Sequence, residues 1–159
     1  MTMRIGQGFD VHAFGDNIPL VIGGVKIPFY KGLIGHSDAD VLLHAICDCL
    51  LGAASLRDIG YHFSDKDPQF RGVSSRKLVL EVHHKIKNEG FDIVNLDCTV
   101  ILEKPKIASF IPDMVQNISE VLEIDSNQIN IKAKTSEKLG YLGRGEGVAA
   151  QTICLLKKR

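Results

Sequence analysis

The sequence predicts an α/β protein of the α+β kind, a two-layer sandwich in which helices cover one face of a mixed β-sheet. Segments with the two-residue periodicity of strands alternate with longer segments of helical periodicity. Residues 20–22 and 25–27 flank a Gly-Gly pair that is typical of a tight hairpin turn. The 159 residues can bury one core, and no repeat or linker interrupts them. We therefore expect a single domain over residues 1–159.

Charge and hydropathy exclude two classes of partner. The chain has 19 basic and 19 acidic residues, so no strong field attracts nucleic acid or an anionic membrane surface. The opening residues lack the apolar segment of a signal peptide, and His44 and Asp48 interrupt the most apolar stretch, residues 41–54. We expect a cytoplasmic protein with neither nucleic acid nor membrane as a partner, although a removed organelle-targeting segment would leave no trace.

The four cysteines form no Cys-x-x-Cys pair, and the two that are close in sequence would point to different sides of a helix. They are Cys47, Cys49, Cys98 and Cys154. We predict that they are reduced core residues.

The first predicted strand covers residues 4–14. Its odd positions are apolar, whereas Asp10 and His12 fall on the other parity, which indicates a strand with a polar face. The hairpin over residues 20–27 follows it, since two adjacent glycines tolerate the positive φ angles of such a turn.

A helix is predicted over residues 37–51, because Ser37 suits an N-cap and Asp38 and Asp40 suit the positive end of the helix dipole. Residues 56–73 hold glycine, proline and several aspartates. They predict a long loop, and loops of that length often act as lids.

A second helix is predicted from Ser74, a possible cap, to Gly90. His83 and His84 are expected to face solvent. The buried stripe is predicted to consist of Leu78, Val82 and Ile86.

The rest of the chain predicts three strands and one helix. Residues 94–102 alternate as a strand does, and Pro112 begins a helix whose apolar stripe is Val115, Ile118 and Leu122. Two more strands are predicted near residues 129–134 and 147–156.

Asp10 and His12 are candidate metal ligands. Side chains at positions i and i+2 of a strand project the same way, so these two emerge side by side. His44 is the best candidate for a third ligand because it interrupts an apolar segment, and two histidines with one carboxylate are the ligand set of a catalytic zinc site with an open fourth position. Simpler explanations stay open: Asp-x-His is common on strands, and His44 could be a core histidine bonded to Asp40 or Asp48.

Two other segments have the chemistry of phosphate binding. Residues 134–140 follow a predicted strand and run into a glycine-rich stretch at 143–147, which together offer hydroxyls, backbone N–H groups and cations. His36-Ser37 at a helix start likewise has the form of an anion site. Taken by itself, the segment over residues 134–147 could be an ordinary glycine-rich turn, and Ser37 could merely cap the helix.

Five segments in this order and spacing resemble one family, the 2-C-methyl-D-erythritol 2,4-cyclodiphosphate synthases of the non-mevalonate isoprenoid pathway. The resemblance covers nearly the whole chain. The segments are GFDVH at 8–12, IGGVKIP at 22–28, HSDADVLLHAICDCLLGAA at 36–54, DIG at 58–60 and KTSEKLGYLGRGEG at 134–147. Three positions depart from the family pattern: Ser64 replaces proline, Ser136 replaces threonine and Tyr141 replaces phenylalanine. Of these three departures, only Ser64 bears on an expected structure, because it leaves the conformation of residues 61–67 open.

The resemblance implies a lyase that converts 4-diphosphocytidyl-2-C-methyl-D-erythritol 2-phosphate to a cyclic diphosphate and CMP. The nucleophile is already an anionic phosphate, so the reaction needs positioning and charge neutralisation more than a strong base. By the same resemblance, Asp10, His12 and His44 hold Zn²⁺, while Glu137 and the substrate diphosphate hold Mg²⁺ or Mn²⁺. His36 and Thr135 are the implied catalytic residues, which donate hydrogen bonds to phosphate.

The implied substrate-binding residues come from five parts of the chain. They are Asp10, His12, His36, Ser37, Asp58, Ile59, Gly60, Phe63, Ser64, Asp65, Lys104, Pro105, Lys106, Ala108, Lys134, Thr135, Ser136, Glu137, Tyr141 and Arg144. Asp58 and Gly60 would hold the erythritol, with residues 61–67 closing over it, and residues 102–108 would read the cytosine edge.

The family forms homotrimers with sites between neighbouring subunits, so the resemblance implies a homotrimer here. It also places Arg144 and Glu146 towards a central cavity, where some members hold an isoprenoid diphosphate.

Two rival functions remain at this point. A zinc phosphohydrolase would use the open metal position to generate hydroxide, and its product would be a ring-opened phosphate. A trimeric binding protein with a structural metal is the other rival, although structural zinc sites prefer cysteine-rich ligand sets.

Overall fold

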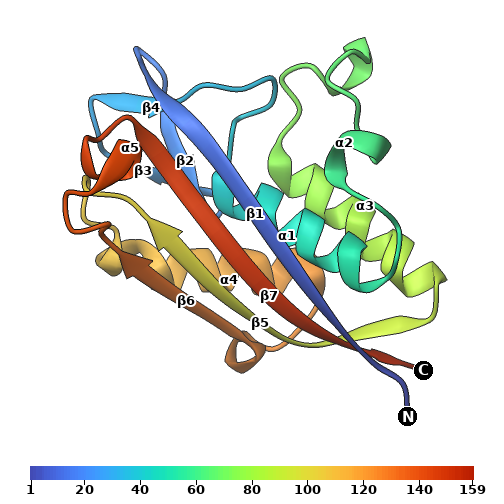
Figure 1. The fold of residues 1–159 in the computed structure, drawn as a ribbon. Helices are drawn as coiled ribbons and strands as arrows, with labels where there is room; N and C mark the ends of the chain where they lie inside the picture. Colours follow the sequence, from blue (N-terminus) through green and yellow to red (C-terminus); the bar gives the residue numbers. More distant parts are fainter.

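The computed structural model describes all 159 residues as two layers, with helices packed on one face of a sheet (Figure 1). The strands are β1 (Met3–Asp16), β2 (Leu20–Ile22), β3 (Val25–Ile27), β4 (Lys31–Leu33), β5 (Phe91–Ile101), β6 (Ile129–Lys134) and β7 (Gly147–Lys158). The α-helices are α1 (Val41–Ala53), α2 (Ile59–His62), α3 (Ser75–Asn88), α4 (Ile111–Leu122) and α5 (Gly140–Gly143). Short 3₁₀ turns cover Pro68–Phe70, Ala108–Phe110 and Ser126–Gln128.

The main sheet has five strands in the order β4-β1-β7-β5-β6. Only β5 and β6 are parallel, and the other neighbouring pairs are antiparallel. Strands β2 and β3 form a separate hairpin, and α1, α3 and α4 lie behind the main sheet in Figure 1. The predicted sandwich with a mixed sheet is therefore confirmed.

The covered face of β1 is the one that carries Gly6, Gly8 and the two candidate metal ligands. Gly6 and Gly8 are buried, and Asp10 and His12 are half-buried. The apolar residues of the other parity point away from the helices and stay exposed, together with one residue of β7. They are Ile5, Phe9, Val11 and Ile153, which are 75%, 49%, 41% and 48% exposed.

Helix α1 lies unusually close to β1 because two glycines leave room for it. A Cβ atom at Gly8 would overlap the Ala45 carbonyl oxygen and lie 2.8 Å from the Cys49 nitrogen, and one at Gly6 would overlap the Cys49 carbonyl oxygen. Ala45 and Cys49 are four residues apart, so these small side chains form one ridge of the helix that faces the glycines. The contact places the His44 side chain beside those of Asp10 and His12.

The N-terminus of α1 is fixed by Asp40, which is fully buried. Its carboxylate caps the helix by accepting the N–H of Leu43 at 3.0 Å. It also accepts the N–H groups of Gly23 and Gly24 in the β2–β3 turn, at 2.9 and 2.6 Å. Burial raises the pKa of Asp40 to about 6, although these N–H groups oppose the rise. One carboxylate thus joins the hairpin to the start of the helix.

This arrangement corrects the predicted helix start. Ser37 and Asp38 precede the helix, and the Ser37 hydroxyl instead accepts the N–H of Ala39 within a turn. The predicted long loop over 56–73 is also wrong in part, because it contains α2 and a 3₁₀ turn. The short edge strand β4 was not predicted, since three residues carry no periodic signal.

In α3 the predicted stripe of Leu78, Val82 and Ile86 is buried. The prediction for His84 is confirmed, but that for His83 is wrong, because only 2% of His83 is exposed. The helix buries a stripe wider than one residue per turn. Desolvation by this burial lowers the pKa of His83.

The second half follows the predicted pattern with one shift. β5 begins at Phe91, and a bulge between Ile93 and Asn95 changes which parity is buried, so Val94 is only half-buried. α4, β6 and β7 lie where the sequence predicts them, although Val115 is only half-buried. All four cysteines are free and buried, as expected. None of the helices is long and apolar enough to cross a membrane.

We predict that Gly8→Ala destabilises the protein, because its Cβ overlaps the α1 backbone, which cannot move without shifting the helix. The free energy of unfolding, measured by urea denaturation, should fall by about 3 kcal/mol. The matched control is Gly52→Ala. Its Cβ would meet only the Gln7 carbonyl oxygen, at 4.0 Å, so better helix propensity should raise stability by up to about 1 kcal/mol. Equal stability of the two variants would contradict the close-contact explanation.

Candidate metal centre and phosphate-binding loops

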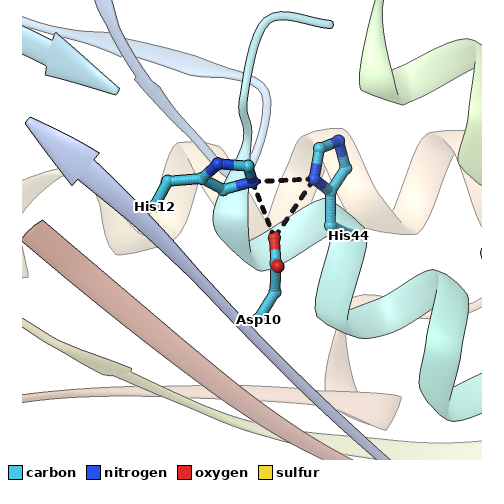
Figure 2. Close-up of side chains that lie close together, drawn as sticks. All are labelled: Asp10, His12 and His44. Carbon is cyan, nitrogen blue, oxygen red and sulfur yellow. Dashed lines mark hydrogen bonds and ion pairs between the residues drawn. The ribbon is translucent and has the colours of Figure 1, made fainter. Parts of the chain in front are cut away.

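Asp10 and His12 of β1 and His44 of α1 point at one another (Figure 2). Asp10 Oδ2 lies 2.9 Å from His12 Nε2 and 3.1 Å from His44 Nδ1, and the two nitrogens are 3.2 Å apart. Ligands that surround a zinc ion tetrahedrally at about 2.0 Å are about 3.3 Å from one another. The three residues therefore form a group that could hold a metal ion.

The hydrogen bond of His12 Nδ1 determines which ring nitrogen of His12 carries a lone pair. Nδ1 lies 2.9 Å from the carbonyl oxygen of Ile34, which can only accept a hydrogen bond. The assigned tautomer therefore carries its hydrogen on Nδ1. In the neutral ring, the lone pair of Nε2 then faces Asp10 and His44.

His44 is oriented by a serine and an aspartate from outside its helix. Its Nε2 lies 2.8 Å from the Oγ of Ser75, which is fully buried at the start of α3. The Ser75 hydroxyl donates to Asp38 Oδ1, so it can accept the Nε2–H and leave the Nδ1 lone pair towards the metal group. Ser37 Oγ is a second neighbour of Nε2, at 3.0 Å. The His44 ring bonds neither Asp40 nor Asp48, so the alternative of a core histidine held by one of these side chains is wrong.

The ionised carboxylate of Asp10 makes the group of Asp10, His12 and His44 suitable for binding a cation. Burial raises the pKa of Asp10, but hydrogen bonds and charge interactions with His12 and His44 outweigh it, and the pKa falls to about 2. Burial lowers the pKa of His12, but its bond to Asp10 prevails and the pKa lies above the ordinary 6.5. Without a metal, a proton on His12 therefore stabilises the Asp10 carboxylate. A metal ion competes with that proton, so metal affinity should weaken as the pH falls.

A pocket of about 270 Å³ opens beside the metal group. It is lined by both histidines and by most of the predicted residues from the first half of the chain. These lining residues are His36, Ser37, Ile59, Gly60, Phe63 and Asp65. His36 Nε2 lies 3.7 Å from an Asp65 carboxylate oxygen, and both side chains are largely exposed.

Asp58 and Ser64 do not line this pocket. Asp58 caps α2 by accepting the N–H of Tyr61 at 2.8 Å, and the Ser64 hydroxyl accepts the N–H of Lys66 at 3.2 Å. Both residues shape the segment that carries the lining residues.

The predicted residues from the second half gather elsewhere. A pocket of about 200 Å³ is lined by Pro105, Lys106, Ala108, Lys134 and Thr135. None of these residues lines the pocket beside the metal group. The structure thus gathers the predicted residues of the first half of the chain around one pocket and several of the second half around another. Within one chain, these two pockets stay separate.

Glu137 and Ser136 lie on the loop after β6 and are not part of the metal group of Asp10, His12 and His44. Ser136 donates its N–H to Glu103, and Glu137 is exposed with a left-handed φ of 54°. The role of Glu137 as a metal ligand stays a prediction.

Arg144 and Lys104 line a third pocket, of about 460 Å³, whose other walls include Lys138 and Phe29. Arg144 donates to Glu146 at 2.6 Å. Tyr141 is 43% exposed and lines none of these three pockets. The isoprenoid diphosphate implied near Arg144 stays a prediction.

Sequence reasoning missed Asp38 and Ser75 as residues that orient His44. Asp38 was assigned to the helix dipole, and Ser75 was not singled out, although Ser74 before it was named as a possible cap. The two are 37 residues apart, so no local pattern could join them.

The family model described as YgbB matches residues 3–157. The chain belongs to this family. A protein of Nitrosomonas europaea named 2-C-methyl-D-erythritol 2,4-cyclodiphosphate synthase is 58% identical over 97% of this chain and 94% of its own length. A Bacillus pumilus protein of the same name is 53% identical over 99% of both chains.

Solved structures of the family share the fold. The bifunctional IspDF of Campylobacter jejuni matches 99% of this chain and 43% of its own, with 42% identity and a TM-score of 0.96. The CDP complex of IspF from Plasmodium falciparum matches 99% of this chain and 97% of its own, with 36% identity and a TM-score of 0.87.

We predict that Ser75→Ala weakens Zn²⁺ binding about 10- to 100-fold, because His44 loses the hydroxyl that orients its ring. Competition with a chromophoric chelator measures the affinity. Ser74→Ala is the matched control, since the neighbouring Ser74 side chain makes no capping hydrogen bond. Equal affinity of the two variants would show that the link from Asp38 through Ser75 does not support the site.

Proposed function

We propose that this protein is a metal-dependent lyase of isoprenoid biosynthesis by the non-mevalonate pathway. It converts 4-diphosphocytidyl-2-C-methyl-D-erythritol 2-phosphate to 2-C-methyl-D-erythritol 2,4-cyclodiphosphate and CMP. The observation that carries the proposal is the group of Asp10, His12 and His44, whose lone pairs converge beside a pocket of the size of a small sugar phosphate. Relatives that are more than half identical over at least 97% of this chain bear the name of this activity.

Zn²⁺ is the ion that best fits the proposed centre, because two imidazoles and one carboxylate leave a fourth position open. When bound there, zinc supplies a Lewis acid that neutralises charge on a phosphate oxygen. The chain itself holds the ligand geometry through Ile34, Ser75 and Asp38. These contacts arrange the site before the substrate arrives, so little reorganisation is needed.

The proposed reaction forms a bond between an oxygen of the 2-phosphate and the β-phosphorus. The bond from that phosphorus to the bridging oxygen breaks, and CMP leaves with the electron pair. His36 and Ser37 line the pocket beside the metal group, and both can donate hydrogen bonds to phosphate oxygens. Because both reacting groups are anionic, holding them together supplies much of the catalysis.

The test is incubation of the protein with the proposed substrate and mass analysis of the products. Equimolar CMP and cyclic diphosphate are expected, and removal of the metal with a chelator should abolish both. Ring-opened phosphate as the product would instead support the zinc phosphohydrolase. Binding without any product would support the binding protein with a structural metal.

A complete site needs a second subunit in this proposal. The pocket with Lys106 and Thr135 shares no lining residue with the pocket beside the metal group. The outer face of the sheet also exposes Ile5, Phe9 and Val11 to water, which favours burial against another copy. A homotrimer packed through its sheets would cover this face and join the two half-sites in a cyclic arrangement. The CDP complex of the Plasmodium relative supports a cytidine nucleotide as the ligand.

We predict that Glu137→Gln leaves zinc content unchanged but raises the Mg²⁺ or Mn²⁺ concentration needed for half-maximal activity at least about tenfold. These hard ions prefer an ionised oxygen ligand, and Gln removes the charge at nearly constant size. Metal titrations of activity measure the shift. An unchanged titration curve would remove Glu137 from the second metal site.

We predict that two inactive variants, His44→Ala and Thr135→Ala, regain activity when mixed and allowed to exchange subunits. Some interfaces of a mixed trimer would pair an intact metal centre with an intact loop after β6, since cyclic assembly joins each chain to the next. Activity should reach a fraction of wild type set by random assortment. Mixed trimers, confirmed by native mass spectrometry, that stay inactive would show that each site is built within one chain.

A further inference from the structure

We propose that Glu103 is a positioning residue, whose carboxylate holds the loop over residues 135–138 in the conformation that presents Thr135 and Glu137. The inference rests on the proposed function, because it assigns Glu103 to the site of that reaction. Glu103 does not enter the reaction itself in this proposal. It acts through the backbone of the loop.

The carboxylate of Glu103 bonds the loop at two backbone groups through one oxygen. Oε1 accepts the N–H of Ser136 at 3.0 Å and the N–H of Lys138 at 3.1 Å. The Ser136 hydroxyl is 3.3 Å from the same oxygen, but its single hydrogen has a nearer acceptor in the Leu139 carbonyl, at 2.8 Å. Both backbone bonds are charge-assisted, which makes them stronger than neutral ones.

The loop needs such support because its backbone is strained. Glu137 and Lys138 have φ angles of 54° and 61°, in the left-handed region that residues with a Cβ seldom adopt. Two non-glycine residues in succession persist there only when surrounding contacts hold them. Turns of this kind direct their N–H groups inward and create a concavity that binds an anion. Glu103 supplies that anion from within the chain.

The place of Glu103 in the fold explains why it can reach the loop. The Leu102 N–H bonds the Lys134 carbonyl at 2.9 Å and so extends the pairing of the parallel strands β5 and β6 by one step. The regular pairing of the two strands ends there, and the Glu103 side chain links the segment after β5 to the loop after β6. Glu103 also lines the pocket that holds Lys106 and Thr135.

This bridge fixes the spacing between two halves of the proposed substrate site. Residues 102–108 would hold the cytosine, while Thr135 and Glu137 would meet the phosphates and the second metal. Without the carboxylate, the left-handed residues are expected to relax, and Glu137 would lose its fixed direction. A metal ligand that must be ordered at each binding event binds its ion more weakly.

The experiment compares Glu103→Ala, Glu103→Gln and a matched control, Glu81→Ala, which removes an exposed glutamate of α3 that makes no hydrogen bond or ion pair. In Glu103→Ala, the Mg²⁺ concentration for half-maximal activity should rise at least about tenfold, with unchanged zinc content and melting temperature. Glu103→Gln keeps a carbonyl oxygen for the same two N–H groups, so its shift should stay within about threefold. Glu81→Ala should match wild type.

Hydrogen exchange of the purified protein tests the positioning without any assay of activity. The amides of Ser136 and Lys138 should exchange at least about tenfold faster in Glu103→Ala than in wild type, and those of α1 should not change. This readout remains valid if the wild type fails to form the cyclic product, an outcome that would overturn the proposed function alone.

Three outcomes would overturn the inference about Glu103. The first is a Mg²⁺ dependence and loop exchange in Glu103→Ala that equal those of Glu81→Ala. The second is a general loss of zinc or of folding in Glu103→Ala, which would indicate a role in overall stability. The third is an equal defect in Glu103→Gln and Glu103→Ala, which would indicate that the negative charge itself acts on a metal or on the substrate.

Discussion

The close contact between β1 and α1 is the constraint on which the candidate metal centre depends. Gly6 and Gly8 let the helix backbone approach the strand to a distance that any larger residue would prevent. The strand then continues, in the same register, to Asp10 and His12, while the helix presents His44 one residue before Ala45 of the contact ridge. Backbone packing therefore sets the distances between the ligand atoms, and small side chains at the contact keep them fixed.

Buried polar groups complete the placement of His44. Asp40 joins the N-terminus of α1 to the β2–β3 turn, and the fully buried Ser75 joins the start of α3 to the ring of His44. Each group bonds elements that are distant in the sequence, and each would be costly to bury without its partners. Networks of this kind restrict a side chain to one orientation, which a catalytic metal ligand requires.

The second half of the predicted site lies apart from the metal group within one chain. The loop after β6 and the segment after β5 meet each other through Glu103, but they share no pocket with the metal group. The outer face of the sheet is also apolar and exposed. The symmetric assembly that we propose would account for both facts, because packing sheet against sheet would bury that face and bring half-sites of different chains together.

The sequence by itself determined the elements with strong periodicity, the side-by-side emergence of Asp10 and His12, and the family motifs, because all of these depend on neighbours along the chain. Only the tertiary structure decided that Asp40 and not Ser37 caps α1, that His83 is buried, and that the helices cover the glycine face of β1. It alone joined Ser75 to Asp38, and Glu103 to the strained loop. The reason is that such contacts depend on the partner that folding brings near: the Asp40 carboxylate also bonds Gly24, 16 residues away, and Ser75 bonds Asp38, 37 residues away.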